Sequence, residues 1–281
     1  LPAHLMFADN FSVQTNSTSI NPSSNDLPGR QSGIYRGATY TERAGTPADF
    51  VQVDHADYPG ALRLAGQVGS FNLASVSPDV NFDAFGGPSH FVLEYSVKPT
   101  DLAGNVSWAA AVVGSSSQIA GVNSSDGIGL LVRQTGGYQI FDGTSGTNVS
   151  KQSGTLATPL DPDGWYDVRI NYFVPEFDDV TRGGVSIFVD DALIYSAATD
   201  SGFANNYLVF MGYSEGTSGT IAAHGFDNIR FWTTAIPEPS TAVLLALGLG
   251  LLPLRRGRRA VRERSAREVG PQVVALHGAP T

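Results

Sequence analysis

Between Gly164 and Phe173 the chain reads GWYDVRINYF, and apolar side chains alternate with polar ones along its length. A period of two places every second side chain on the same face of an extended strand. The apolar face holds Tyr166, Val168, Ile170 and Tyr172, and the polar face holds Asp167, Arg169 and Asn171. The stretch therefore predicts a β-strand at 165–173 with one buried face.

The same alternation recurs on both sides of this stretch, at 91–98, 185–189, 207–213 and 226–232. Turn-forming clusters of Gly, Pro and Asp separate these segments. No stretch of similar length in residues 1–236 has apolar residues at the 3.6-residue period of a helix. We therefore predict an all-β domain over residues 1–235, folded as a two-sheet antiparallel sandwich.

The composition excludes several classes of protein. The chain has 281 residues, 42% hydrophobic and 15% charged, with 32 Gly and no Cys. Without Cys there is no disulfide scaffold, thiolate metal site or Cys nucleophile. The formal net charge of -9 also argues against nucleic-acid binding, which needs a basic surface.

This net charge is the sum of two unlike parts. Residues 1–236 contain 10 Lys and Arg against 23 Asp and Glu, a net charge of −13, whereas residues 237–281 carry +4. Such asymmetry marks a boundary between parts with different roles.

The C-terminal part has three successive features. Pro237-Glu238-Pro239 is followed by 242–254, which has no polar side chain, and then by an arginine cluster. The cluster consists of Arg255, Arg256, Arg258 and Arg259. As a helix, residues 242–254 would span about 20 Å, and snorkelling arginines would help them reach across a bilayer. Because such clusters stay on the cytoplasmic side, we predict a short membrane helix with residues 1–236 exported.

This three-part order over 236–259 resembles the PEP-CTERM sorting signal of Gram-negative bacteria. The resemblance implies recognition and cleavage by an exosortase, a membrane-embedded cysteine peptidase. It further implies anchoring in the inner membrane before processing, and then release to the cell surface or an exopolysaccharide matrix. Residues 260–281 extend past the usual end of such signals, and we expect this extension to be disordered. We expect the N-terminal export signal to have been removed from this sequence.

Several strings in residues 7–232 resemble the concanavalin A-like (laminin G-like) jelly-roll superfamily. They are 164–170 and 184–194, together with an opening strand at 7–11 and a closing strand at 225–231. The resemblance implies a jelly roll whose first and last strands pair. Asp191 stands where the family favours Gly in the hairpin turn, so we expect that turn to differ in detail.

Calcium is the metal that this resemblance favours. Jelly rolls of this class often bind it where the first and last strands meet, and Asp9 and Asp227 occupy the corresponding strings. Hard oxygen ligands suit Ca²⁺. The simpler interpretation is that Asp9 caps a backbone group and Asp227-Asn228 forms a turn or bulge.

Carbohydrate binding would need exposed aromatic faces beside hydrogen-bonding groups. Trp108 and Tyr138 are candidates for such faces, although aromatic residues in strands more often belong to a core.

We find no catalytic residues in the sequence. The string Glu176-Phe177-Asp178 matches only half of the E-x-D-x-x-E pattern of related glycosidases, because Thr181 stands where the second Glu belongs. The chain is therefore interpreted as a non-enzymatic, exported protein of the cell surface or exopolysaccharide matrix, with either a structural or a carbohydrate-binding role. The alternatives are a polysaccharide hydrolase or lyase with a cryptic site, and an adhesin.

Overall fold

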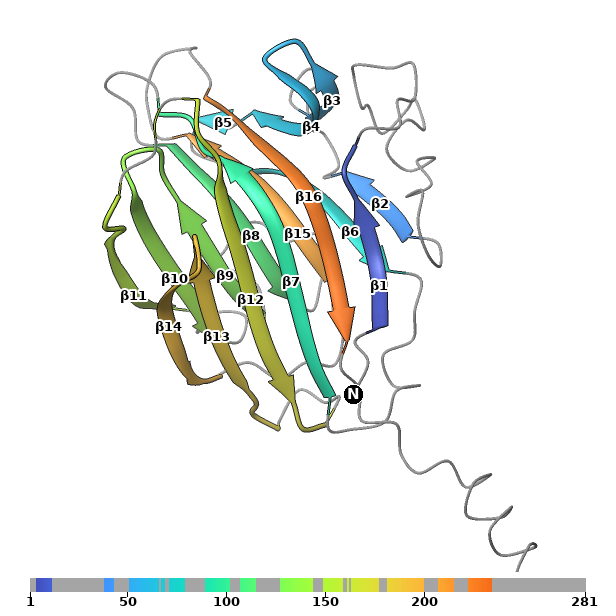
Figure 1. Ribbon diagram of the computed structural model, residues 1–281, viewed down its shortest axis with the longest axis vertical. Coiled ribbons are helices and arrows are strands. Elements are labelled where there is room, and N and C mark those ends of the chain that lie inside the picture. The colour runs from blue at the N-terminus through green and yellow to red at the C-terminus, as the bar shows by residue number, and fades with distance from the viewer. Residues whose placement is uncertain are drawn as a thin grey trace, which may run out of the picture. The chain divides into compact units, whose positions relative to one another are not determined.

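The computed structural model describes part of the chain (Figure 1). The described residues are 4–11, 38–42, 51–65, 67–68, 71–78, 89–101, 107–114, 127–143, 149–158, 161, 163–176, 181–199, 207–214 and 222–233. They all belong to the first of two units, Leu1–Ile236 and Pro237–Thr281. The predicted sorting signal, membrane helix and extension therefore lie outside the described residues. Within the described ranges, no helix is long and apolar enough to span a membrane.

Eight strands form one sheet, here called sheet A. Its order is β14-β13-β12-β7-β16-β4-β3, and β1 also pairs with β16. The bounds are β1 His4–Asp9, β3 Val51–His55, β4 Tyr58–Ala65, β7 Ser89–Lys98, β12 Tyr166–Val174, β13 Gly184–Val189, β14 Ala192–Ala198 and β16 Ala223–Thr233.

Six strands form the second sheet, sheet B, in the order β11-β10-β9-β8-β15-β5. Strands β2 and β6 pair with each other. The bounds are β2 Ala38–Glu42, β5 Gln67–Val68, β6 Phe71–Pro78, β8 Ser107–Gly114, β9 Gly127–Val132, β10 Gly137–Gly143, β11 Val149–Thr155 and β15 Tyr207–Ser214. Among the described strands, only β5 and β15 pair in parallel.

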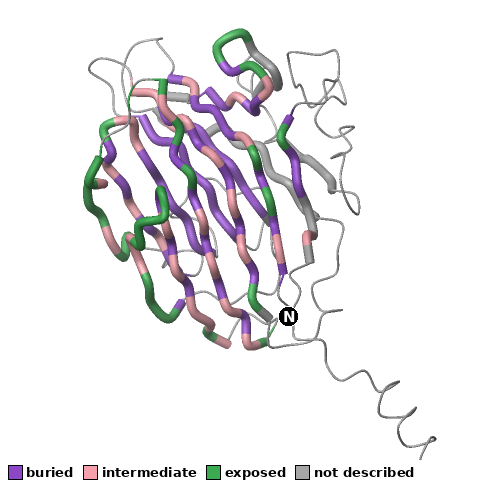
Figure 2. Tube along the Cα trace, in the orientation of Figure 1, coloured by how far each residue is buried: buried purple, intermediate pink, exposed green. Residues whose placement is uncertain are grey.

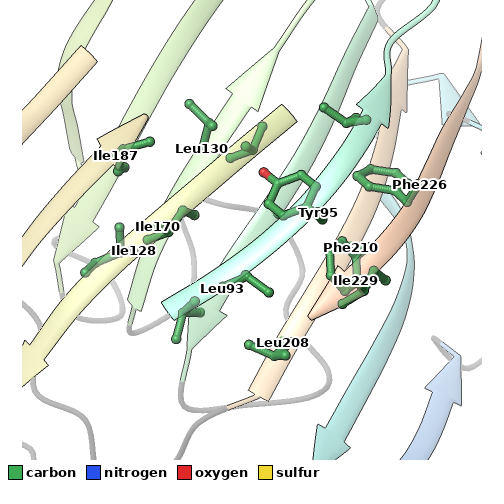
Figure 3. Close-up of a cluster of buried hydrophobic side chains, with 14 of the residues drawn as sticks. Leu93, Tyr95, Ile128, Leu130, Ile170, Ile187, Leu208, Phe210, Phe226 and Ile229 are labelled. Atoms are coloured by element: carbon green, nitrogen blue, oxygen red, sulfur yellow. The ribbon is translucent and has the colours of Figure 1, made fainter. Parts of the chain in front are cut away.

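Sheet A lies in front of sheet B in Figure 1, and the core fills the space between them. Along β12 buried residues alternate with exposed or half-buried ones, as the alternation in 165–173 predicts (Figure 2). Tyr95 of sheet A meets Phe210 of sheet B edge-to-face, with ring centroids 5.6 Å apart (Figure 3). The predicted all-β antiparallel sandwich is confirmed.

The first and last described strands pair, as the family resemblance implies. The second half of β16 pairs with β1 and its first half pairs with β4, so two strands share one edge of β16. A bulge between Asp227 and Arg230 separates the two halves. Because β1 ends at this bulge, the chain turns there and buries Phe11 completely in the core.

The hairpin between β13 and β14 has a two-residue loop, since Val189 pairs with Ala192. Its central residues Asp190 and Asp191 both have positive φ, at 47° and 61°. Positive φ at both central residues is the signature of a type I′ turn, which strongly prefers Asn-Gly or Asp-Gly. Asp191 therefore adopts a left-handed backbone conformation that glycine adopts without penalty.

Candidate functional site

Asp9 and Asp227 lie at the junction of β1 and β16. The Asp9 Oδ1 atom accepts a hydrogen bond from the backbone N–H of Phe11, at 2.8 Å. Phe11 has a φ of 52°, which is unfavourable for a bulky residue, and this bond helps to hold the turn. Asp9 therefore caps a backbone group, as the simpler interpretation predicts.

Asp227 belongs to the predicted bulge. Its Oδ1 atom accepts the backbone N–H of Asn228 at 2.7 Å, and Asn228 has a φ of 51°. Burial raises the pKa of Asp227, the bond from Asn228 opposes this rise, and the negative charge of Asp9 adds to it. The two carboxylates are thus close enough to repel each other.

A cation between Asp9 and Asp227 would relieve this repulsion. Carboxylate pairs do bind Ca²⁺, but such sites usually take six to eight oxygens. In the described part of the chain, no group of three His, Cys, Asp or Glu could hold a metal ion. Calcium at this junction therefore stays a hypothesis.

Tyr138 points into the core of the sandwich. It is 8% exposed, and its hydroxyl accepts a hydrogen bond from Gln152 Nε2 at 2.9 Å. Its ring covers Gly154, where an added Cβ would come within 2.7 Å of the hydroxyl oxygen. These contacts give Tyr138 a structural role, and its burial leaves little of the residue open to a sugar.

Trp108 lies on the opposite, outer face of sheet B, so it does not form a joint platform with Tyr138. The Arg133 guanidinium carbon lies 5.3 Å from the centroid of the Trp108 ring. Arg133 also approaches Asp101, with Nη2 3.7 Å from Oδ2. Burial raises the pKa of Asp101, and the charge of Arg133 opposes the rise. Trp108 is 9% exposed, so it is covered in this structure.

The outer face of sheet B is largely apolar. A second buried cluster gathers there, separate from the main core. It consists of Trp108, Ala110, Val112, Leu131, Val209 and Met211, with Phe141 and Tyr213 packed against it.

The outer face of sheet A carries charged residues in cross-strand rows. In the strand register, Glu94 of β7 lies directly between Arg169 of β12 and Arg230 of β16. In the next row, Asp167 and Asp227 both pair with Ser96. Since directly opposed residues lie about 5 Å apart, each row is a continuous strip of polar groups.

A depression of about 380 Å³ lies over these rows. Its lining side chains are Glu94, Ser96, Asp167, Arg169, Phe188, Asp191, Asn228 and Arg230, and the buried residues Tyr95 and Val168 also contribute. We call the hollow formed by these residues the depression.

Hydrogen bonds fix two of its carboxylates. Trp232 Nε1 donates to Glu94 Oε2 at 3.0 Å, and Ser96 Oγ donates to Asp167 Oδ1 at 2.8 Å. The Arg169 guanidinium lies over the Phe188 ring, 4.4 Å from its centroid. Both carboxylates and this guanidinium are therefore held in place before any ligand arrives.

The sequence predicted which side chains face outward here but not that they meet. Alternation along 91–98 and 165–173 assigns Glu94, Ser96, Asp167 and Arg169 to the polar faces of two strands. These four side chains lie next to one another only because β7 pairs with β12, and each is more than 70 residues away from its paired residue in the chain. Arg230 and Asn228 join them only through the bulge in β16.

No protein-family model and no curated protein matches the chain. Solved structures match over most of its length. An endo-1,3-beta-glucanase from Streptomyces sioyaensis has a TM-score of 0.51 at 10% identity, over 82% of this chain and 96% of that one. The Emp46p carbohydrate recognition domain, in its metal-free form, has a TM-score of 0.48 at 8% identity, over 83% and 98%.

A Bacillus licheniformis beta-glucanase has a TM-score of 0.46 at 13% identity, over 77% of this chain and 99% of that one. At 10% identity the likeness to the endo-1,3-beta-glucanase shows the fold alone, a two-sheet β-sandwich.

Proposed function

We propose that the β-sandwich is a non-enzymatic carbohydrate-binding domain whose ligand binds in the depression on sheet A. The observation that carries the proposal is the row Arg169–Glu94–Arg230 beside Ser96 and Asp167. Each sugar hydroxyl can donate and accept a hydrogen bond. Guanidinium groups donate only and carboxylates accept only, so alternating them on one rigid sheet serves both needs.

The aromatic residues at this face support the same ligand class. Phe188 lines the depression and Trp232 is half-buried beside it, bonded to Glu94. Aromatic rings provide the apolar surface on which the C–H groups of a sugar pack. The glucanase that shares this fold adds that carbohydrate is a ligand the architecture can accommodate.

If the protein were a hydrolase or lyase, the carboxylates of the depression would have to take part in the reaction itself. A glycosidase uses one carboxyl group as proton donor and another as nucleophile or base. Glu94 and Asp167 each accept a hydrogen bond from a neighbouring side chain, an arrangement that suits orientation of a ligand. Release of reducing sugar from a polysaccharide by the full-length chain would favour the hydrolase instead.

Binding is tested with the full-length chain on an array of neutral and uronate-containing oligosaccharides, followed by calorimetric titration of the strongest binder. We expect Arg230→Ala to weaken binding at least fivefold, because it removes donors from the depression. Arg182→Ala is the matched control, since Arg182 is also exposed but lies outside the depression. Absence of binding by the unmodified chain to every oligosaccharide would contradict the proposal, as would equal losses in both variants.

We further propose that residues 236–259 sort this domain to the cell surface or an exopolysaccharide matrix through an exosortase-type peptidase. The support is the order of Pro237-Glu238-Pro239, the apolar segment 242–254 and the arginine cluster. The arginines would orient the segment in the inner membrane, with the sandwich outside.

Sorting is tested by replacing Pro237, Glu238 and Pro239 with alanine in a tagged full-length chain. We expect the variant to stay uncleaved in the membrane fraction while the unmodified chain is released. The matched control replaces Ser240 and Thr241, which lie beside the motif, and should be released normally. Unchanged release of the triple variant would refute the sorting proposal.

A further inference from the structure

The turn between β13 and β14 holds two consecutive aspartates in a left-handed conformation. Asp190 has a φ of 47° and Asp191 a φ of 61°. Residues with a Cβ rarely adopt such angles, and although aspartate tolerates them better than most, glycine adopts them without penalty. Each aspartate therefore needs a reason for its place.

Asp190 has a structural reason. Its Oδ1 atom accepts the backbone N–H of Asp167 at 2.9 Å. Its own backbone N–H donates to the Asp167 carbonyl oxygen at 2.8 Å. These two bonds tie the hairpin turn to the start of β12, and glycine could make only the second of them.

Asp191 has no comparable reason in the described structure. Its carboxylate approaches Arg169 Nη1 only at 4.0 Å, and its side chain is 96% exposed. Exposed ion pairs of this kind contribute little to stability. Glycine at this position would relieve the backbone without loss of a strong contact.

The Asp191 carboxylate does, however, line the depression, beside Phe188 and Arg169. Unfavourable backbone geometry that folding does not explain is often kept for function. A carboxylate offers two acceptor oxygens, which suit two neighbouring hydroxyl groups. Its negative charge would also repel a ligand that carries a carboxylate.

We infer that Asp191 is a specificity-determining residue of the depression, which accepts hydroxyl groups of a neutral glycan and disfavours acidic glycans. The inference rests on the proposed carbohydrate-binding function. It predicts that Asp191 lowers the stability of the fold but contributes to ligand selectivity, whereas Asp190 contributes to stability.

The test compares Asp191→Gly, Asp191→Asn and Asp190→Gly by thermal melting and by titration with cellohexaose, laminarihexaose and hexagalacturonate. Asp191→Gly should melt about 2–4 °C higher than the unmodified chain and bind the preferred neutral hexasaccharide at least tenfold more weakly. Asp191→Asn keeps a side chain suited to the turn, so it should melt normally while its preference for neutral over acidic ligand falls. Asp190→Gly should not gain stability, because it loses the bond to Asp167.

Two results would overturn the inference while leaving the proposed function intact. One is full affinity and selectivity in Asp191→Gly, and the other is a melting temperature of that variant at or below that of the unmodified chain. If the unmodified chain binds none of the hexasaccharides and no array glycan, the proposed function fails and the inference fails with it.

Discussion

His224 is fully buried at the start of β16 and is neutral in the folded protein. Its Nδ1 atom accepts the backbone N–H of Thr100 at 3.1 Å, so the proton of the neutral ring resides on Nε2. Burial lowers the pKa of His224 from 6.5 to about 4, and the backbone carbonyl of Tyr213 opposes the shift. His224 therefore binds a proton less readily in the folded protein than in the unfolded chain.

We predict that this residue makes the sandwich acid-sensitive. The unfolded chain binds the proton below about pH 6.5 and the folded protein only near pH 4, so stability falls as pH decreases through this interval. The full loss is roughly 3 kcal/mol for a difference of this size. Chemical denaturation at pH 7, 5 and 4 measures it.

His224→Asn retains a hydrogen-bond acceptor for Thr100 but cannot titrate, so its stability should fall less over the same interval. His90→Asn is the control, because His90 is exposed on the outer face beside Phe173. An identical pH dependence in His224→Asn and the unmodified chain would rule out this assignment.

At the level of elements, β11 and β14 are the exposed edge strands of sheets B and A on one side of the sandwich (Figure 1). Gln152 of β11 donates from Nε2 to the Tyr138 hydroxyl at 2.9 Å and to the Ile194 carbonyl oxygen at 2.7 Å. Ile194 is the unpaired residue of a bulge in β14. One amide group therefore links the two sheets and occupies an edge carbonyl that could pair with another chain.

We predict that Gln152→Ala destabilises the protein by about 2 kcal/mol, because it leaves two polar groups without this partner. It should also increase self-association, since the edge of β14 is then open to strand pairing. Denaturant titration and sedimentation velocity measure the two effects. Ser153→Ala, an exposed neighbour on the same strand, should change neither.

Five of the sixteen described strands were predictable from alternation. The segments expected at 91–98, 165–173, 185–189, 207–213 and 226–232 correspond to β7, β12, β13, β15 and β16. Alternation reveals a strand because burial of one face acts on every second residue locally. The bulge in β16 was anticipated only as a simpler interpretation of Asp227-Asn228, because a bulge depends on the partner strand as well as on its own residues.

At the level of the whole domain, contacts between rings join the two sheets. Phe210 of β15 packs against Tyr95 and Phe226 of sheet A, with ring centroids 5.6 and 5.3 Å away (Figure 3). Since the chain has no Cys, this core replaces any covalent link between the sheets.

We predict that Phe210→Ala lowers the free energy of unfolding by about 3–5 kcal/mol, as expected for a large cavity between two sheets. Amide hydrogen exchange should accelerate together in β7 and β15, because both sheets lose the same contact. Phe141→Ala is the control, since Phe141 packs on the outer face of sheet B and not between the sheets. Faster exchange in β15 alone would contradict a single cooperative core.

In the five alternating segments, the amino-acid sequence alone determined which residues face the core, because alternation is a local property that each strand carries by itself. It also carries the complete C-terminal pattern on which the sorting proposal rests. Only the tertiary structure decided which outward side chains meet. Glu94 and Trp232 form their hydrogen bond across 138 residues of chain, and Tyr138 and Trp108 lie on opposite faces of sheet B. Strand order and register follow from the packing of the whole core, and no local pattern specifies them.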